Sequence, residues 1–207
     1  MTLRSTTLAL TLALGCAAFL FQAVAAPTSA RAEPDASTKI ERPYDVVKRM
    51  MLDKFFDELR AAKSQDDGNR AMAKIWHMWM TSGRPGVDGL LRQSHAVMMR
   101  GALGLALRLA DRVVEMAPTH SEAWNHRATV HYLRGDYGKA VGDIQKALQR
   151  EPRHFGALAG LGFIYIKLKK WDGALKAFEA ATAVNPWLHH RAKVMKMLRL
   201  KVSGQAL

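Results

Sequence analysis

The sequence has little cysteine and few acidic residues, and both shortages limit what the protein can be. Cys16 is the only cysteine among 207 residues, which excludes a small domain held together by disulfides. Lys and Arg total 31 against 18 Asp and Glu, so a disordered acidic tail is also excluded. The remaining composition, 49% hydrophobic and 24% charged, is that of an ordinary globular protein and not of a multi-span membrane protein.

Sequence patterns that carry chemistry are missing as well. The chain has no H-E-x-x-H or C-x-x-C motif, no nucleophile elbow, and no known nucleic-acid-binding motif. Residues 135–139 contain two glycines and a lysine, but Ala140 follows where a phosphate loop needs Ser or Thr. Glu122 and His126 can share a helix face, yet two residues do not supply the ligands of a metal site. We therefore expect a protein that is not an enzyme, with no cofactor, no metal and no nucleic-acid partner.

The N-terminus has the three-part pattern of a secretory signal peptide. Arg4 precedes an uncharged stretch at 5–30, which ends in two Ala-x-Ala sites, at 23–25 and 30–32. This pattern predicts a signal peptide over 1–32 and a periplasmic or secreted protein, with a disordered spacer at 33–43. An uncleaved segment that anchors the chain to the inner membrane is the alternative. An acylated lipoprotein is disfavoured, because Cys16 lies inside the apolar stretch.

A 34-residue period is the strongest signal in the rest of the chain. Pro118, Pro152 and Pro186 follow this spacing, and so do the alanines at 106, 140 and 174. The period predicts three blocks, each with two helices separated by a turn near Gly101, Gly135 or Lys169. We place the blocks at 87–120, 121–154 and 155–188.

The blocks resemble the tetratricopeptide repeat family. The third block fits the family pattern best, with matching residues at Leu161, Gly162, Tyr165, Ala174, Phe178 and Pro186. The second block keeps Trp124, Ala140 and Pro152, whereas the first keeps only Ala106 and Pro118. The resemblance implies an all-α fold, a right-handed α-solenoid of antiparallel helix pairs with about three repeats over 87–188.

The flanking segments fit the same architecture. Apolar residues at helical spacing predict a degenerate N-terminal helix pair over 44–86, which we interpret as a worn repeat or a cap. Residues 189–207 predict a basic amphipathic helix that caps the last repeat.

The resemblance also implies a function, namely a non-enzymatic scaffold or adaptor that binds a protein or peptide in the concave groove. In such solenoids the first helix of each block lines this groove. The predicted groove residues are Arg92, His95, Met99, Asn125, Thr129, Tyr132, Phe163, Ile166 and Lys167. A purely structural role, packing between repeats, is the other interpretation of Phe163 and Ile166.

An alternative function follows from the positive charge. The C-terminal helix carries Lys193, Lys196 and Arg199 and no acidic residue. These side chains suit an anionic envelope surface, such as a membrane, lipopolysaccharide or a cell-wall polymer. The simpler interpretation is that they form the solvated face of the capping helix.

Overall fold

The computed structural model describes residues 42–189 and 191–204, so the predicted signal peptide and nearly all of the predicted spacer lie outside it. All regular structure in the described ranges is helical, which agrees with the all-α prediction. None of these helices has both the length and the apolar character needed to cross a membrane. The helices are α1 Pro43–Ala61, α2 Gln65–Met80, α3 Pro85–Met99, α4 Leu103–Met116, α5 Ser121–Arg134, α6 Tyr137–Arg150, α7 Phe155–Lys167, α8 Trp171–Val184 and α9 Arg191–Val202.

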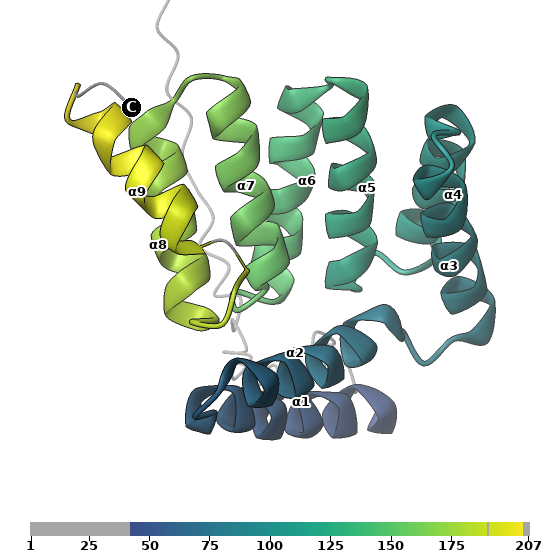
Figure 1. Ribbon diagram of the computed structural model, residues 1–207. Helices are drawn as coiled ribbons and strands as arrows, with labels where there is room; N and C mark the ends of the chain where they lie inside the picture. The colour runs from purple at the N-terminus through teal and green to yellow at the C-terminus, as the bar shows by residue number, and fades with distance from the viewer. Residues whose placement is uncertain (1–41, 190, 205–207) are drawn as a thin grey trace, which may run out of the picture. The chain divides into compact units, whose positions relative to one another are not determined.

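Three antiparallel helix pairs, α3–α4, α5–α6 and α7–α8, stack side by side (Figure 1). The turn inside each pair contains a residue with positive φ: Gly101 at 79°, Gly135 at 83° and Lys169 at 56°. A backbone in this region reverses direction tightly, and glycine adopts it without steric cost. The three turns fall at the positions that the 34-residue spacing indicated.

Small residues allow the helices of a pair to approach each other. Ala106, Ala140 and Ala174 are completely buried where the helices meet. Gly162 is required for the same reason, because a Cβ there would lie 2.5 Å from the ring of Phe178. The repeat positions are therefore explained by close helix packing.

The N-terminal pair α1–α2 does not simply continue the stack. It lies across the ends of the other helices, and α2 contacts both α3 and α5 (Figure 1). Trp76 of α2 packs against Gly156 at the start of α7, and Trp187, which follows α8, packs against Gly68 of α2. The indole of Trp187 also donates to the Leu59 carbonyl at 3.2 Å. The first helix pair thus contacts the last repeat directly.

Helix α9 packs against α8 at the other end of the stack. Leu198 is completely buried, and Val194 and Met195 lie against the same cluster as Phe178. The apolar side of α9 therefore covers the end of the last repeat.

Candidate functional site

The first helices of the three pairs form the inner face of the stack. Helix α5, the first helix of its pair, contacts the first helices of both neighbouring pairs, α3 and α7. Among the described helices, α6 makes no such contact with the second helices α4 and α8. The first helices are therefore closer together than the second helices, which curves the stack toward α3, α5 and α7. The predicted groove residues all lie on these three helices.

Those residues differ in how far solvent can reach them. Asn125 is buried, and Thr129, Tyr132 and Ile166 are partly buried. Met99 is 72% exposed and Phe163 is 46% exposed. The remaining predicted groove residues are exposed polar side chains, Arg92, His95 and Lys167.

The helix pair α1–α2 covers the half of the inner face formed by the beginnings of α5 and α7. Trp79 stacks on the ring of His154, with 3.9 Å between ring centroids and 11° between planes. His154 Nε2 lies 2.9 Å from a Glu122 carboxylate oxygen, and the Asn125 amide donates to the same oxygen at 2.9 Å. We call this part of the inner face, which contains Glu122, Asn125 and His154, the covered half. Asn125 lies within its buried polar network and not on an open surface.

Burial controls the ionisation of several groups near the covered half. The ammonium of Lys48, on α1, donates a hydrogen bond to the Thr81 carbonyl. Burial lowers the pKa of Lys48 to about 8, although the negative charges of Asp88 and Glu122 act to raise it. Burial also lowers the pKa of His120 to about 3, and the nearby charge of Lys48 acts in the same direction. His126 lies 2.7 Å from Ser94 Oγ, and burial lowers its pKa to about 4. These histidines are therefore neutral at neutral pH.

The other half of the inner face is open, and its residues lie toward the ends of α3, α5 and α7. Its exposed apolar surface comes from Met99 and Phe163, and Tyr132 on α5 and Ile166 on α7 are partly accessible. The ring of Phe163 also meets Phe178 edge-on at 5.0 Å. Phe163 therefore packs between helices and still presents an open side. We call this surface, with His95 and Thr129, the open half.

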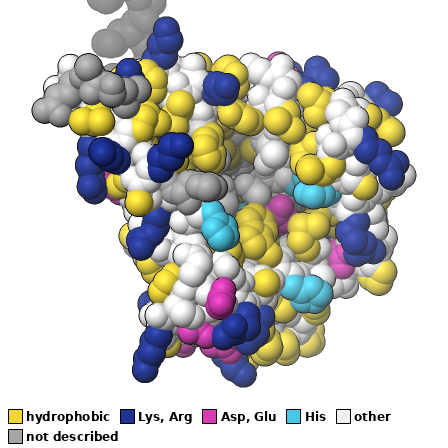
Figure 2. All heavy atoms as spheres, viewed as in Figure 1, with side chains coloured by type: hydrophobic (Ala, Val, Ile, Leu, Met, Phe, Trp, Pro, Cys, Tyr) yellow, Lys and Arg dark blue, Asp and Glu magenta, His cyan; other side chains and the backbone are white. Residues whose placement is uncertain are grey.

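Side-chain types are unevenly distributed over the molecule. Figure 2 shows Lys and Arg mainly around the margin of the face viewed, His side chains nearer its centre, and hydrophobic side chains in both places. A groove with apolar contact surface and a polar rim can hold a peptide segment, because apolar side chains provide the affinity and polar ones the orientation.

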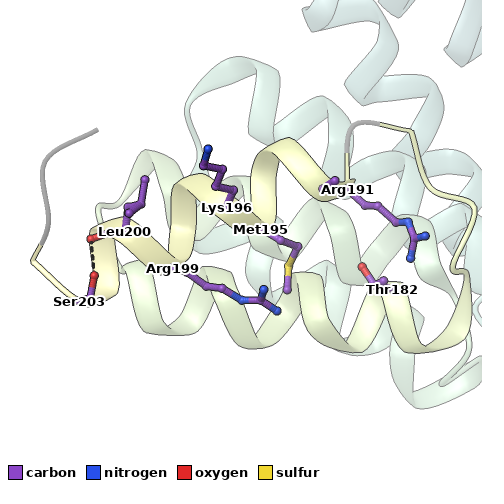
Figure 3. A pocket seen from close by; sticks show the side chains of 8 residues that line it. Thr182, Arg191, Met195, Lys196, Arg199, Leu200 and Ser203 are labelled. Carbon is purple, nitrogen blue, oxygen red and sulfur yellow. Dashed lines mark hydrogen bonds between the residues drawn. The ribbon is translucent and has the colours of Figure 1, made fainter.

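A second concave region, between α8 and α9, could be anticipated only in part from the sequence. This hollow has a volume of about 660 Å³ and is open to solvent, and Figure 3 shows the side chains that line it. The basic spacing of α9 indicated Lys196 and Arg199, which line it, but gave no sign of Thr182 on α8. Lys193 is exposed on α9 but is not among the lining residues.

The described residues offer no group of three or more His, Cys, Asp or Glu side chains able to hold a metal ion. Glu122 and His126, which share α5, make separate contacts to His154 and Ser94. Their arrangement is that of a buried hydrogen-bonded network.

Comparison with known proteins agrees with the repeat pattern. A family model described as anaphase-promoting complex, cyclosome, subunit 3 matches residues 99–181. A TPR repeat-containing protein of Rhizobium etli is 29% identical over 156 residues, which is 75% of this chain and 76% of that protein.

Solved structures share the fold. The Sgt2 TPR domain from Aspergillus fumigatus has a TM-score of 0.55 and 22% identity, over 58% of this chain and 81% of that domain. The TPR2B domain of yeast Sti1, solved in complex with pHsp70, has a TM-score of 0.53 and 18% identity, over 59% of this chain and 100% of that domain. The 34-residue spacing, the paired helices and these similarities agree. The chain is therefore similar in sequence to tetratricopeptide repeat proteins and shares the all-α fold of their domains.

Proposed function

We propose that the protein is an adaptor of the bacterial cell envelope that binds a protein or peptide segment in the open half of its groove. The observation that carries this proposal is the exposure of Met99 and Phe163 on the inner face. Large apolar side chains exposed on the helices of the inner face favour an interaction site over a solvated surface. The yeast Sti1 domain, bound to pHsp70, supports a peptide as the ligand of such a groove.

The geometry limits the chemistry of that segment. Because α1–α2 occupies the covered half, only the open half is left for a ligand, so the segment is short. Tyr132 and Phe163 offer aromatic contact surface, and Arg92 and Lys167 are exposed basic side chains on the same helices. We infer that the ligand presents apolar anchor residues, in an extended or helical conformation, rather than an acidic C-terminus alone.

Removing two aromatic side chains tests the groove. Tyr132→Ala combined with Phe163→Ala should weaken binding of a partner captured from an envelope extract by about 2 kcal/mol or more, because hot spots are commonly aromatic. The full chain is titrated with the captured partner. The matched control is Val47→Ala with Met50→Ala, which removes apolar side chains that are 56% and 65% exposed on α1.

The control should bind normally. If the aromatic double variant keeps the partner and the α1 variant loses it, binding lies outside the groove.

The effect of salt distinguishes groove binding from the alternative function, binding to an anionic surface. Contact of Lys193, Lys196 and Arg199 with an anionic polymer is lost at high ionic strength. An apolar groove contact persists under the same conditions.

Export is tested by the N-terminus of the protein in its native host. Cleavage at the second Ala-x-Ala site leaves Glu33 as the first residue, and cleavage at the first site leaves Ala26. Mass spectrometry of protein released from the envelope should find Glu33 or, as second choice, Ala26. Intact Met1 in the membrane fraction would instead support an uncleaved anchor.

A further inference from the structure

Exposed hydrophobic side chains gather along one edge of the stack, beyond the groove. We call this the turn edge; it consists of 99–105, 133–139 and 167–172, the three turns that join the helices of each pair (Figure 1). Four large apolar side chains on these segments are exposed: Met99 (72%), Leu133 (49%), Leu105 (40%) and Leu168 (40%). Each turn contributes at least one of them.

Basic residues alternate with these apolar side chains. The three segments contain six Lys or Arg and only two acidic residues, Asp136 and Asp172. Asp136 is engaged by Arg134 at 3.2 Å. Figure 2 shows hydrophobic and basic side chains next to one another along its upper margin. The exposed basic residues apart from Arg134 are Arg100, Lys139, Lys167, Lys169 and Lys170.

The α1–α2 side of the molecule is different. Its charges are balanced by nearby ion pairs, including Lys74 with Glu58 at 2.7 Å and Arg153 with Asp53 at 2.7 Å. Helix α1 has exposed apolar side chains too, but acidic residues lie among its basic ones. The excess of positive charge beside apolar side chains is therefore found at the turn edge and not on the α1–α2 side.

We propose that the turn edge rests on a bilayer that contains anionic phospholipid. Lys and Arg are attracted to the headgroups, while the leucines and Met99 enter the boundary between headgroups and acyl chains. A protein partner fits less well, because Lys is depleted from the cores of protein interfaces and is interspersed with the apolar residues here. The tight turns at Gly101, Gly135 and Lys169 hold these side chains at the same end of the stack.

Vesicle binding of the full chain tests the proposal. Partition is measured on phosphatidylcholine vesicles with and without phosphatidylglycerol. Residues 5–30 carry no charge, so the ratio of the two partition coefficients removes their contribution to first order. Arg100→Glu with Lys139→Glu should lower this ratio about tenfold or more. The control Lys54→Glu with Lys63→Glu changes the net charge equally, from exposed positions on and just after α1, and should leave the ratio within about twofold.

The apolar contribution needs its own variant. Leu105→Gln, Leu133→Gln and Leu168→Gln together should reduce binding to the anionic vesicles about tenfold at low and high salt. Met99 is left unchanged because it also belongs to the open half. The matched control is Val47→Gln with Met50→Gln on α1. Melting temperature confirms that each variant is folded.

Hydrogen exchange of the unmodified chain gives a second result that needs no variant. On anionic vesicles the amides of the turn edge should be protected and those of α1 should not. Equal losses for control and edge variants, or protection confined to α9, would overturn the proposal. So would edge variants that change the oligomeric mass in solution and leave partition unaffected, since the edge would then join two copies of the chain. Retained groove binding in all edge variants keeps this test separate from the proposed function.

Discussion

Trp79→Ala should cost about 3–5 kcal/mol of the free energy of unfolding, because the side chain is 1% exposed and fills the junction between α2 and α7. Its ring stacks on His154 at 3.9 Å, and it also contacts Phe155 at 4.9 Å and Phe56 at 6.0 Å. The indole Nε1 has no hydrogen-bond partner among the described residues, so the loss comes from packing. Urea unfolding of the full chain measures it.

The same substitution should loosen the α1–α2 pair before the repeats unfold. Hydrogen exchange of amides in α1 and α2 should accelerate more than exchange in α5–α6, since the stack on His154 ties the pair to the inner face. Trp171→Ala is the control, because Trp171 is partly buried beside α9 and does not touch α1–α2. Comparable costs for the two variants, with α1–α2 equally protected in both, would show that the Trp79 stack does not hold the pair in place.

The repeat architecture could be predicted because its information is local and periodic. A small residue every 34 positions, at Ala106, Ala140 and Ala174, marks the place where two helices touch, and all three are completely buried. The turns are equally local, because Gly101 and Gly135 provide the positive φ that each reversal requires. Both signals can be recognised without knowledge of distant contacts.

The position of α1–α2 could not be predicted in this way. Its helices were expected from apolar spacing, but its docking depends on single contacts between residues far apart in the chain. Trp76 fits against Gly156, and Trp187 fits against Gly68, where a Cβ would lie 2.2 Å from the indole. The glycines themselves are the sequence signal, because Gly68 and Gly156 lie inside helices, where glycine lowers the stability of the helix. No periodic pattern identifies the tryptophan that opposes it.

The groove prediction shows the same division. The exposed positions of Met99 and Phe163 follow from the helix face on which they lie. Asn125 lies on the same inner face, yet it is buried against Glu122 in the covered half. Which half of the inner face is open is decided by α1–α2, and therefore by contacts that the sequence does not reveal.

Acid should destabilise the protein strongly, and two buried histidines are the reason. Burial lowers the pKa of His120 to about 3 and that of His126 to about 4, from an ordinary value of 6.5. The unfolded chain therefore binds protons at these positions below about pH 6.5, while the folded protein does not. Stability from both groups is complete above pH 6.5 and is lost as the pH falls from 6.5 toward the folded pKa values.

The size of the effect follows from the same numbers. Between about pH 7 and about pH 4.5, each histidine should remove roughly 2 kcal/mol from the free energy of unfolding. Urea unfolding at the two pH values measures the sum. His120→Leu should reduce the loss by about half, because the buried Nε2 of His120 has no hydrogen-bond partner among the described residues and a leucine can occupy its place.

His126 differs from His120 because its ring is hydrogen-bonded to Ser94. His126→Gln preserves a polar group near that hydroxyl, so it should also reduce the acid-induced loss, although it lowers stability at pH 7. His77→Gln replaces an exposed histidine on α2 and is the control. If wild type, His120→Leu and His126→Gln all lose the same free energy between the two pH values, other groups cause the acid sensitivity and the burial of these two rings does not.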